Sequence, residues 1–274
     1  MPRIPIEDNF TDVLAKAQRG AGISDKELCS LAEVTHEDLK ALKSGHLLDA
    51  VLRRVARHLR LSPNALEDLA HKRWYPEIPS FPHGFAAFNT PFGDMTVNSY
   101  LAWDGRTRAA AAFDTGADCG GMLDLVHAEK LQLQMIFITH THEDHVADLA
   151  RLARESGAEV WASEQEPSDH PGARVFSENA HFHLGKIAVK TLSTWGHSKG
   201  QTTFYVTGLS YPLAVVGDSL FASSIGGSPT HFADQYRNDV EKILTLPRNT
   251  VLACGHGPLT TVSQERRHNP FFAP

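Results

Sequence analysis

Five of the six residues in "HTHEDH", positions 140–145, carry ionisable side chains. Imidazole nitrogens and carboxylate oxygens together are ligands that zinc, iron and manganese take in proteins. Two further histidines lie beside glycines, in "WGHS" (His197) and "CGHGP" (His256), and Asp218 ends the run "VVGD". One metal needs only three or four ligands, so this set predicts a pair of metal sites that share a carboxylate and a hydroxide.

Each of these residues also has an ordinary structural explanation. Asp144 could cap a helix that begins at His145. His140 could be a hydrogen-bonded residue at a strand end, and Asp218 could belong to a turn. These explanations fail together, because a structural turn gains nothing from three imidazoles that lose hydration on burial. A second His-x-His, "HFH" at 181–183, lacks the following Asp-His and is interpreted as a strand edge or loop.

The crowded segment lies between a strand and a helix. "MIFIT" before it is apolar and β-rich, and "HVADLARLARES" after it has helical spacing. Other candidate strands are "MTVNSYLAW", "RAAAAFDTG", "AEVWAS", "KIAVKTLST", "TTFYVTG", "YPLAVVGD" and "TVLACGHG". Candidate helices lie near 119–131, 145–155 and 234–246. This mixture predicts an α/β domain over residues 76–274, without a regular parallel repeat.

The composition is that of a folded protein. The chain has 274 residues, of which 42% are hydrophobic and 21% charged. Cys29, Cys119 and Cys254 are far apart and odd in number, which argues against a disulfide framework and for a reducing compartment. "MPRIPIEDNF" has no basic region followed by an apolar core, and no apolar run reaches the length of a bilayer span. We expect a cytoplasmic protein that does not contact membranes.

Residues 1–75 have helical patterns almost throughout and are followed by the proline-rich "RWYPEIPSFP", where we place a boundary before Ile78. "SDKELCSLAEVTHEDLKALKSG" resembles the helix-turn-helix of Cro-type repressors, with Ser24 and Thr35 as helix caps. The helix in the position of a recognition helix opens with "HED". Twelve Lys and Arg against eleven Asp and Glu in this domain give a net charge of +1, too little for the usual DNA footprint. We therefore expect no DNA binding, and we interpret a basic cluster as a solvated helix face: Arg53, Arg54, Arg57 and Arg60.

The helical domain has an apolar face that needs a covering partner, because a domain of this size has a small core. A second copy of the chain is the simplest partner, so a homodimer is predicted. Its helical domain could then form a wall of its own or its neighbour's metal site. The residues of this face recur at helical spacing: Leu48, Val51, Leu52, Val55 and Leu59.

"THTHEDH" resembles the T-H-x-H-x-D-H signature of the metallo-β-lactamase fold, and "GHS", "GDSLF" and "GHGP" are similar to the remaining ligand motifs of that superfamily, in the same order. The resemblance implies an αββα sandwich, here preceded by a small all-α domain, with the metals at one edge of the two sheets. It implies that Asp114 of "FDTG" supports the ligand loops. The implied ligands are His140, His142 and His197 for the first metal, Asp144, His145 and His256 for the second, and Asp218 as the bridge.

Within the superfamily, "VNSYLAWDG", "AAAAFDTGAD" and the tail "GHGPLTTVSQERRHNPFF" are similar to short forms of the hydroxyacylglutathione hydrolases, or glyoxalase II. This implies two divalent ions, zinc or else iron or manganese, and a hydroxide between them that attacks a thioester or other ester carbonyl. Asp144 would orient the hydroxide and accept its proton. The long forms continue after the last histidine into a helical segment that contacts glutathione, whereas eighteen residues follow His256 here. The thiol carrier therefore stays open.

Other functions are compatible with the same motifs. A lactonase is one, although a thiolate leaves without the protonation that an alkoxide needs, which favours a thioester. A mononuclear-iron persulfide dioxygenase, which fills only one site, is another. In a third, the sandwich senses a ligand and the helices bind DNA, but such a regulator would not need both Asp144 and Asp218. Phe221 and Tyr236 are candidates for the walls of a substrate pocket.

Overall fold

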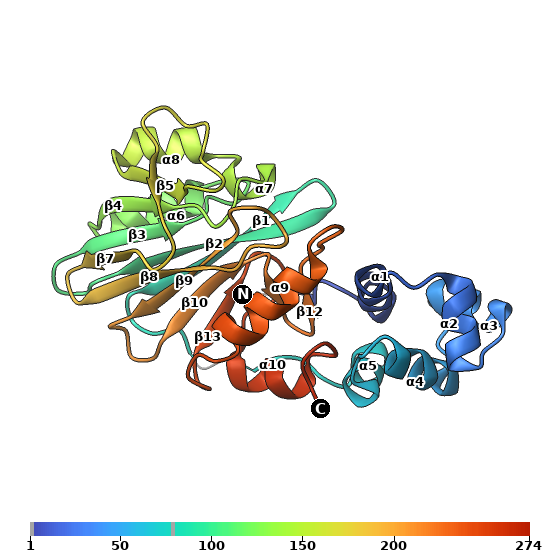
Figure 1. Cartoon of the computed structure of the whole chain (residues 1–274). Helices are drawn as coiled ribbons and strands as arrows, with labels where there is room; N and C mark the ends of the chain where they lie inside the picture. The colour runs from blue at the N-terminus through green and yellow to red at the C-terminus, as the bar shows by residue number, and fades with distance from the viewer. Residues whose placement is uncertain (1–2, 78–79) are drawn as a thin grey trace.

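The structure, a computed structural model, describes residues 3–77 and 80–274. Ile78, where the sequence places the start of the second part, lies outside the described residues. A group of helices stands beside a sandwich of two sheets, and the C-terminus lies between the two parts (Figure 1). In the described part of the chain, no helix combines the length and the apolar character needed to cross a bilayer.

Capping residues set the ends of the N-terminal helices. Asn9 and Ser24 form capping boxes, and the Thr35 hydroxyl accepts a hydrogen bond from the backbone N–H of Asp38. The caps predicted at Ser24 and Thr35 are confirmed. The helices are α1 (Phe10–Ala21), α2 (Asp25–Ala32), α3 (His36–Lys43), α4 (Asp49–His58) and α5 (Pro63–Ala70). We call residues 10–70 the helical part.

The apolar face predicted around α4 is covered within the chain. It packs against the other N-terminal helices and against Ile225 and Phe271 of the sandwich. The backbone N–H of Ser62 also donates to the carbonyl of Pro270 over 2.8 Å. The argument for a second copy is therefore wrong at this face, because the C-terminal segment of the same chain completes the small core. The residues concerned are buried or half-buried: Leu48, Val51, Leu52, Val55 and Leu59.

The sandwich consists, within the described residues, of two six-stranded sheets and a short pair of strands. Both sheets mix parallel and antiparallel neighbours, as predicted. The first has the order β1 (Phe85–Phe92), β2 (Met95–Trp103), β3 (Ala109–Phe113), β4 (Gln132–Phe137), β5 (Glu159–Ser163), β6 (Arg174–Phe176). The second has the order β14 (Thr260–Thr261), β13 (Val251–Cys254), β10 (Leu213–Gly217), β9 (Thr202–Thr207), β8 (Ile187–Ser193), β7 (His181–Leu184). The short pair is β11 (Leu220–Phe221) and β12 (Ser224–Ile225).

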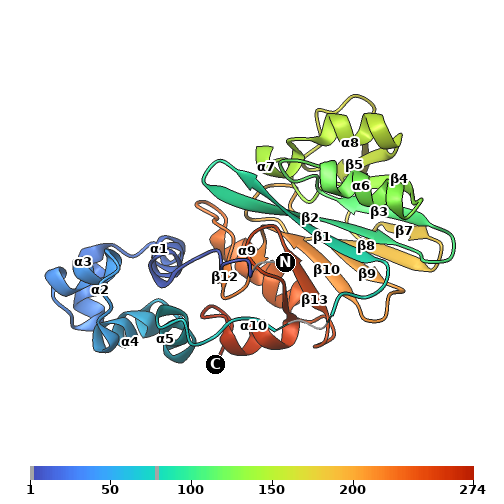
Figure 2. The same ribbon diagram turned by 180° about the vertical axis from the view of Figure 1, so that it is seen from behind.

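Helices cover both outer faces, which confirms the αββα arrangement (Figures 1 and 2). On the first sheet, α6 (Gly120–Ala128) and α8 (Leu149–Ser156) bury an apolar layer. On the second, a π-helical turn η1 (Asp239–Ile243) and α10 (Val262–His268) do the same.

Two of the predicted helices differ in detail. The one expected near 145–155 is split into α7 (Glu143–Val146) and α8. Asp144 therefore lies in the first turn of α7 and does not cap a helix that begins at His145. The one expected near 234–246 begins as α9 (Phe232–Asn238) and continues as η1.

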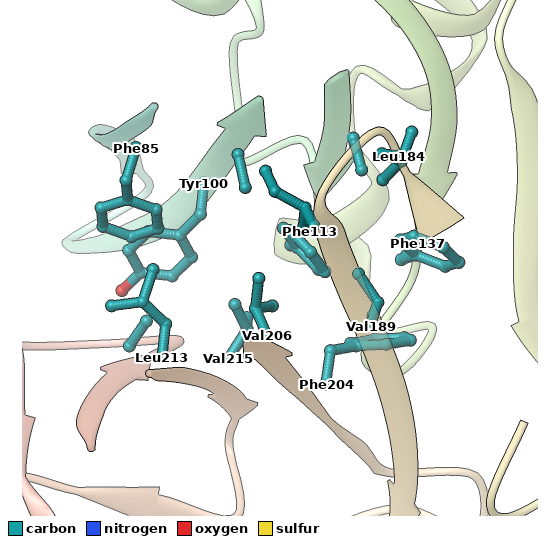
Figure 3. Packing of buried hydrophobic residues seen from close by; sticks show 14 of the residues in the cluster. Phe85, Tyr100, Phe113, Phe137, Leu184, Val189, Phe204, Val206, Leu213 and Val215 are labelled. Carbon is teal, nitrogen blue, oxygen red and sulfur yellow. The ribbon is translucent and has the colours of Figure 1, made fainter. Parts of the chain in front are cut away.

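The core between the sheets is built from aromatic and β-branched side chains (Figure 3). The rings of Phe113 and Phe204 lie 5.5 Å apart, and those of Phe137 and Phe204 lie 5.1 Å apart, so residues from both sheets interlock. Burial of each such ring contributes about 1.5–3 kcal/mol. Because β3, β4, β10 and β13 are fixed by this core, the loops that follow them have a rigid base.

Candidate metal centre

All seven side chains predicted as ligands meet at one edge of the sandwich, in the loops that follow β4, β8, β10 and β13 and in α7. Their ligand atoms lie within 4.8 Å of one another in three overlapping groups. The groups are His140, His142 and His197; His140, His145 and Asp218; and Asp144, His145 and His256. Residues up to 116 positions apart in the chain, 140 to 256, thus surround one small volume.

The first group is formed by imidazoles alone. The Nδ1 atom of His142 lies 3.0 Å from Nε2 of His140 and 3.0 Å from Nε2 of His197. Three nitrogen atoms from two separate loops therefore point to a common centre. The His142 side chain is exposed, whereas His140 is buried, so this group opens to solvent on one side.

We call His140, His142 and His197 the first group, and Asp144, His145 and His256 the second group, which adds a carboxylate. The Oδ2 atom of Asp144 lies 3.2 Å from Nε2 of His256 and 3.6 Å from Nε2 of His145. Asp218 reaches both groups. Its Oδ1 lies 3.2 Å from Nε2 of His145, and its Oδ2 lies 3.6 Å from Nε2 of His197. One carboxylate thus contacts the residues of both groups.

Four of the five imidazoles are held by a hydrogen bond on the outer side of the ring. The Nδ1 atoms of His197 and His256 donate to the carbonyls of Gly227 and Thr96, each over 2.8 Å. Because Nδ1 makes the outer hydrogen bond, Nε2 of each ring faces the centre and would offer its lone pair to a metal once any proton on it is lost, which is the arrangement found at metal ligands.

Asp114 fixes the other two rings, as the resemblance implied. Its carboxylate accepts the backbone N–H of Thr139 over 2.8 Å and the Thr139 hydroxyl over 2.7 Å, and it accepts Nδ1 of His145 over 2.8 Å. The Thr139 oxygen can then only accept from Nδ1 of His140, 3.1 Å away. Asp114 has a left-handed backbone, φ 56°, a strained conformation for a residue with a side chain. One buried carboxylate therefore sets the orientation of two imidazoles.

Two buried polar atoms at the centre make no hydrogen bond: Nε2 of His145 and Oδ1 of Asp218. They lie 3.2 Å apart, yet they are not aligned as donor and acceptor. Unpaired buried polar atoms are costly, and a divalent cation between them would satisfy both. The donor set of imidazoles and carboxylates also suits zinc, iron or manganese, so the residues fit two such ions.

The carboxylates of the centre favour protonation of the two histidines in the second group. Burial opposes charge on His145, but Asp218 and Asp114 outweigh it and raise the pKa of His145 to about 10. Burial likewise opposes charge on His256, but the hydrogen bonds that its ring donates to Asp144 and Asp218 raise its pKa to about 11. Without a metal, these two histidines therefore carry the positive charge that the carboxylates require.

The first group behaves differently. Burial, reinforced by the neighbouring His145, holds the pKa of His140 well below its usual value. Burial also lowers the pKa of His197. Both rings are therefore neutral at physiological pH, the form in which imidazole binds a metal.

Sequence reasoning missed several residues that position the centre. The Glu166 carboxylate accepts the backbone N–H groups of Thr141, over 2.7 Å, and Gly200, over 2.8 Å, and so ties the loop of His142 to the loop of His197. Asn98 donates to the carbonyls of Cys254 (3.0 Å) and Gly257 (2.8 Å) on either side of His256. Glu166 lies in no segment that the sequence analysis singled out, and Asn98 lies in "VNSYLAWDG", whose resemblance gave it no role at the centre.

Of the two residues predicted to line a substrate pocket, one lies beside the centre and the other does not. The ring of Phe221 lies 5.7 Å from that of His256 and is buried beside the centre. Tyr236 instead stacks on Phe272 and lines a cavity with α1, away from the ligands. The "HFH" segment forms part of β7 at the edge of its sheet, as predicted.

Comparison with known proteins gives the same superfamily. Residues 92–256, more than half of the chain, match the metallo-β-lactamase superfamily. A probable metallo-hydrolase of Streptococcus pyogenes is 30% identical over 226 residues, which cover 73% of this chain and 93% of the relative. The hydroxyacylglutathione hydrolase GloC of Haemophilus influenzae is 27% identical over 210 residues, 66% of this chain and 95% of the relative. The crystal structure of TTHA1623 in a di-iron-bound form, 26% identical, superimposes with a TM-score of 0.56 over 67% of this chain and 99% of that one. The superfamily match begins after the helical part, and the resemblance of these helices to a helix-turn-helix is not confirmed.

Proposed function

Because the chain belongs to the metallo-β-lactamase superfamily and is a metal-dependent hydrolase, we propose that it hydrolyses thioesters with two divalent ions bound at the candidate centre. The observation that carries this proposal is the contact of Asp218 with both groups of ligands. A single metal would not require a carboxylate in that place. The likeness to GloC supports a thioester as the substrate.

In this proposal, His140, His142 and His197 hold the first ion, and Asp144, His145 and His256 hold the second. Asp218 is shared between them. Zinc is our first choice, and the di-iron form of TTHA1623 makes iron the alternative to test. The ions, when bound, polarise the scissile carbonyl and lower the pKa of water.

The protein's own groups complete the reaction. Although burial raises the pKa of Asp144, interactions with His256 and His145 lower it overall, so Asp144 stays ionised and can accept a proton from the attacking water. The hydrogen bonds to Asp114, Gly227 and Thr96 keep the imidazoles from turning as charge develops. A departing thiolate needs no acid, and we assign none.

A cavity beside the first group is proposed to hold one arm of the substrate. It has a volume of about 530 Å³, and Trp195 and Lys199 in its lining lie two residues before and after His197. The Trp195 ring packs 5.4 Å from the ring of His231, which gives the cavity an aromatic wall. Apart from Trp195 and Phe176, the lining is polar or charged, which suits a polar arm of the substrate.

Metal analysis of the purified protein, together with a panel of thioesters and lactones, tests the proposal. We expect about two divalent ions per chain and faster turnover of thioesters than of lactones. A single iron per chain, with oxygen consumed in the presence of a persulfide, would replace the hydrolase by a dioxygenase.

A further inference from the structure

The segment before α1 crosses from the helical part to the sandwich and passes beside β12 (Figure 2). It is fixed at both ends. The Asp8 carboxylate pairs with Lys16 and accepts a hydrogen bond from the Ser224 hydroxyl, and Lys16 also donates to the carbonyl of Ile225 over 2.8 Å. Near the start of the segment, the Tyr75 hydroxyl donates to the carbonyl of Ile4 over 2.7 Å. We call residues 3–9 the strap.

The strap packs directly on the loop that carries His256. A Cβ atom added to Gly257 would lie 3.1 Å from the backbone nitrogen of Glu7 and 3.5 Å from the carbonyl oxygen of Pro5. Gly257 follows His256 in the chain, so the backbone of the strap lies against the residue next to a ligand of the second group.

Glu7 carries the charge that the strap brings to the centre. Burial raises the pKa of Glu7, and His256 is the charge that most opposes the rise, with Asp218 among those that add to it. Glu7 thus lies within electrostatic reach of two residues of the centre. No ion pair among residues 3–77 and 80–274 includes Glu7, whereas the charges of Asp8 and Lys16 cancel each other.

We propose that Glu7 forms a wall of the substrate site on the His256 side and selects against substrates that carry a negative charge on the arm next to it. This assignment rests on the proposed hydrolase function. The half-buried carboxylate repels a substrate carboxylate across a region that water screens poorly, whereas a neutral or cationic arm meets no such cost. The strap therefore contributes to specificity within its own chain.

Matched pairs of thioesters test the charge effect. One pair carries the charge on the thiol arm, as S-acetyl-3-mercaptopropionate and its amide, and the other on the acyl arm, as the S-methyl monothioester of glutarate and its amide. In Glu7→Gln, the ratio of kcat/KM for the acid to that for the amide should rise about tenfold in one pair. The pair that responds identifies the arm that faces Glu7. The control Glu37→Gln makes the same charge change on the exposed surface of α3 and should leave both ratios unchanged.

The outcome that overturns the assignment is a ratio within twofold of the unsubstituted protein in both pairs. Loss of bound metal from Glu7→Gln would also overturn it, because Glu7 would then act on the ligands. A binding measurement tests the role of Glu7 separately from the hydrolase proposal. If the unsubstituted protein hydrolyses no thioester, calorimetry of the metal-loaded proteins with 3-mercaptopropionate, glutarate and their amides still decides, by the same tenfold shift or its absence.

Discussion

Gly255 lies at the point where the centre leaves no room for a side chain. A Cβ atom there would come within 2.1 Å of Oδ1 of Asp218 and 2.7 Å of Cε1 of His145. Real Cβ contacts essentially never fall below 3.0 Å, so Gly255→Ala must move the shared carboxylate by roughly 1 Å. A misplacement of that size costs about 10²-fold in turnover, and overpacking costs about 1–3 kcal/mol of stability.

The assay for Gly255→Ala combines metal content with kcat/KM for a thioester. We expect the bound metal to fall below two ions per chain and kcat/KM to fall by about 10²-fold, with the fold retained. Gly227→Ala is the matched control, because a Cβ atom at Gly227 meets nothing within 4 Å and its carbonyl still accepts from His197. Two ions per chain and turnover within threefold of the unsubstituted protein in Gly255→Ala would refute the assignment of Asp218 as a shared ligand.

Three further predictions concern the ligands, the pH dependence and the helical part. Asp144→Asn should keep much of its metal but lose about 10²-fold or more in turnover, whereas Asp218→Ala should empty at least one site; equal metal and near-normal turnover in both would contradict the assigned roles. The pKa values of His145 and His256 are about 10 and about 11 in the folded protein, against 6.5 in the unfolded one. Protonation of these rings therefore stabilises the metal-free protein fully below pH 6.5, and this contribution is lost as the pH rises through the folded pKa values. The Tm of the metal-free protein should therefore fall between pH 7 and 10, and that of the metal-loaded protein should not, because the ions replace the protons; parallel curves would argue against metal binding by these rings. Removal of residues 1–77 should leave metal binding intact but expose Phe271 to water, which costs about 1.5–3 kcal/mol. The truncated protein should therefore aggregate, and it should lose affinity for bulky thioesters more than turnover of small ones. A truncated protein that does not aggregate and has unchanged kinetics would show that the strap is dispensable.

The ligands could be predicted from the sequence because their chemistry is local. "HTHEDH" supplies four of them within six positions, and His197, Asp218 and His256 each follow a strand in a glycine turn. A strand that is buried on both faces ends at a defined place, so the residue after it is positioned by the core. The alternation of strands and helices predicted an α/β domain, whereas the αββα sandwich was implied by the resemblance of the ligand motifs to the metallo-β-lactamase fold.

The residues that hold the ligands in place could not be predicted in this way. Glu166 bonds to Thr141, 25 positions earlier, and to Gly200, 34 positions later. Asn98 reaches across the sandwich to Gly257, 159 positions away. A single Glu or Asn in a loop or strand gives no periodic signal, and only the closed fold shows that it accepts or donates to the backbone of a ligand loop.

The contacts of the helical part with the rest of the chain also could not be predicted from the sequence. From the sequence, the apolar face of α4 required a partner, and a second copy was the simplest choice. In the fold, Phe271, which lies more than 200 positions after α4, belongs to the same buried cluster as that face, and the strap lies against Gly257, the residue after His256. The residues that cover α4 thus include the end of the same chain, and the homodimer stays a prediction. In our proposal, Glu7 of the chain itself supplies the substrate wall expected from a dimer. The acidic start of α3 and the near-neutral charge of the helical part both argue against DNA recognition, because neither feature attracts phosphate.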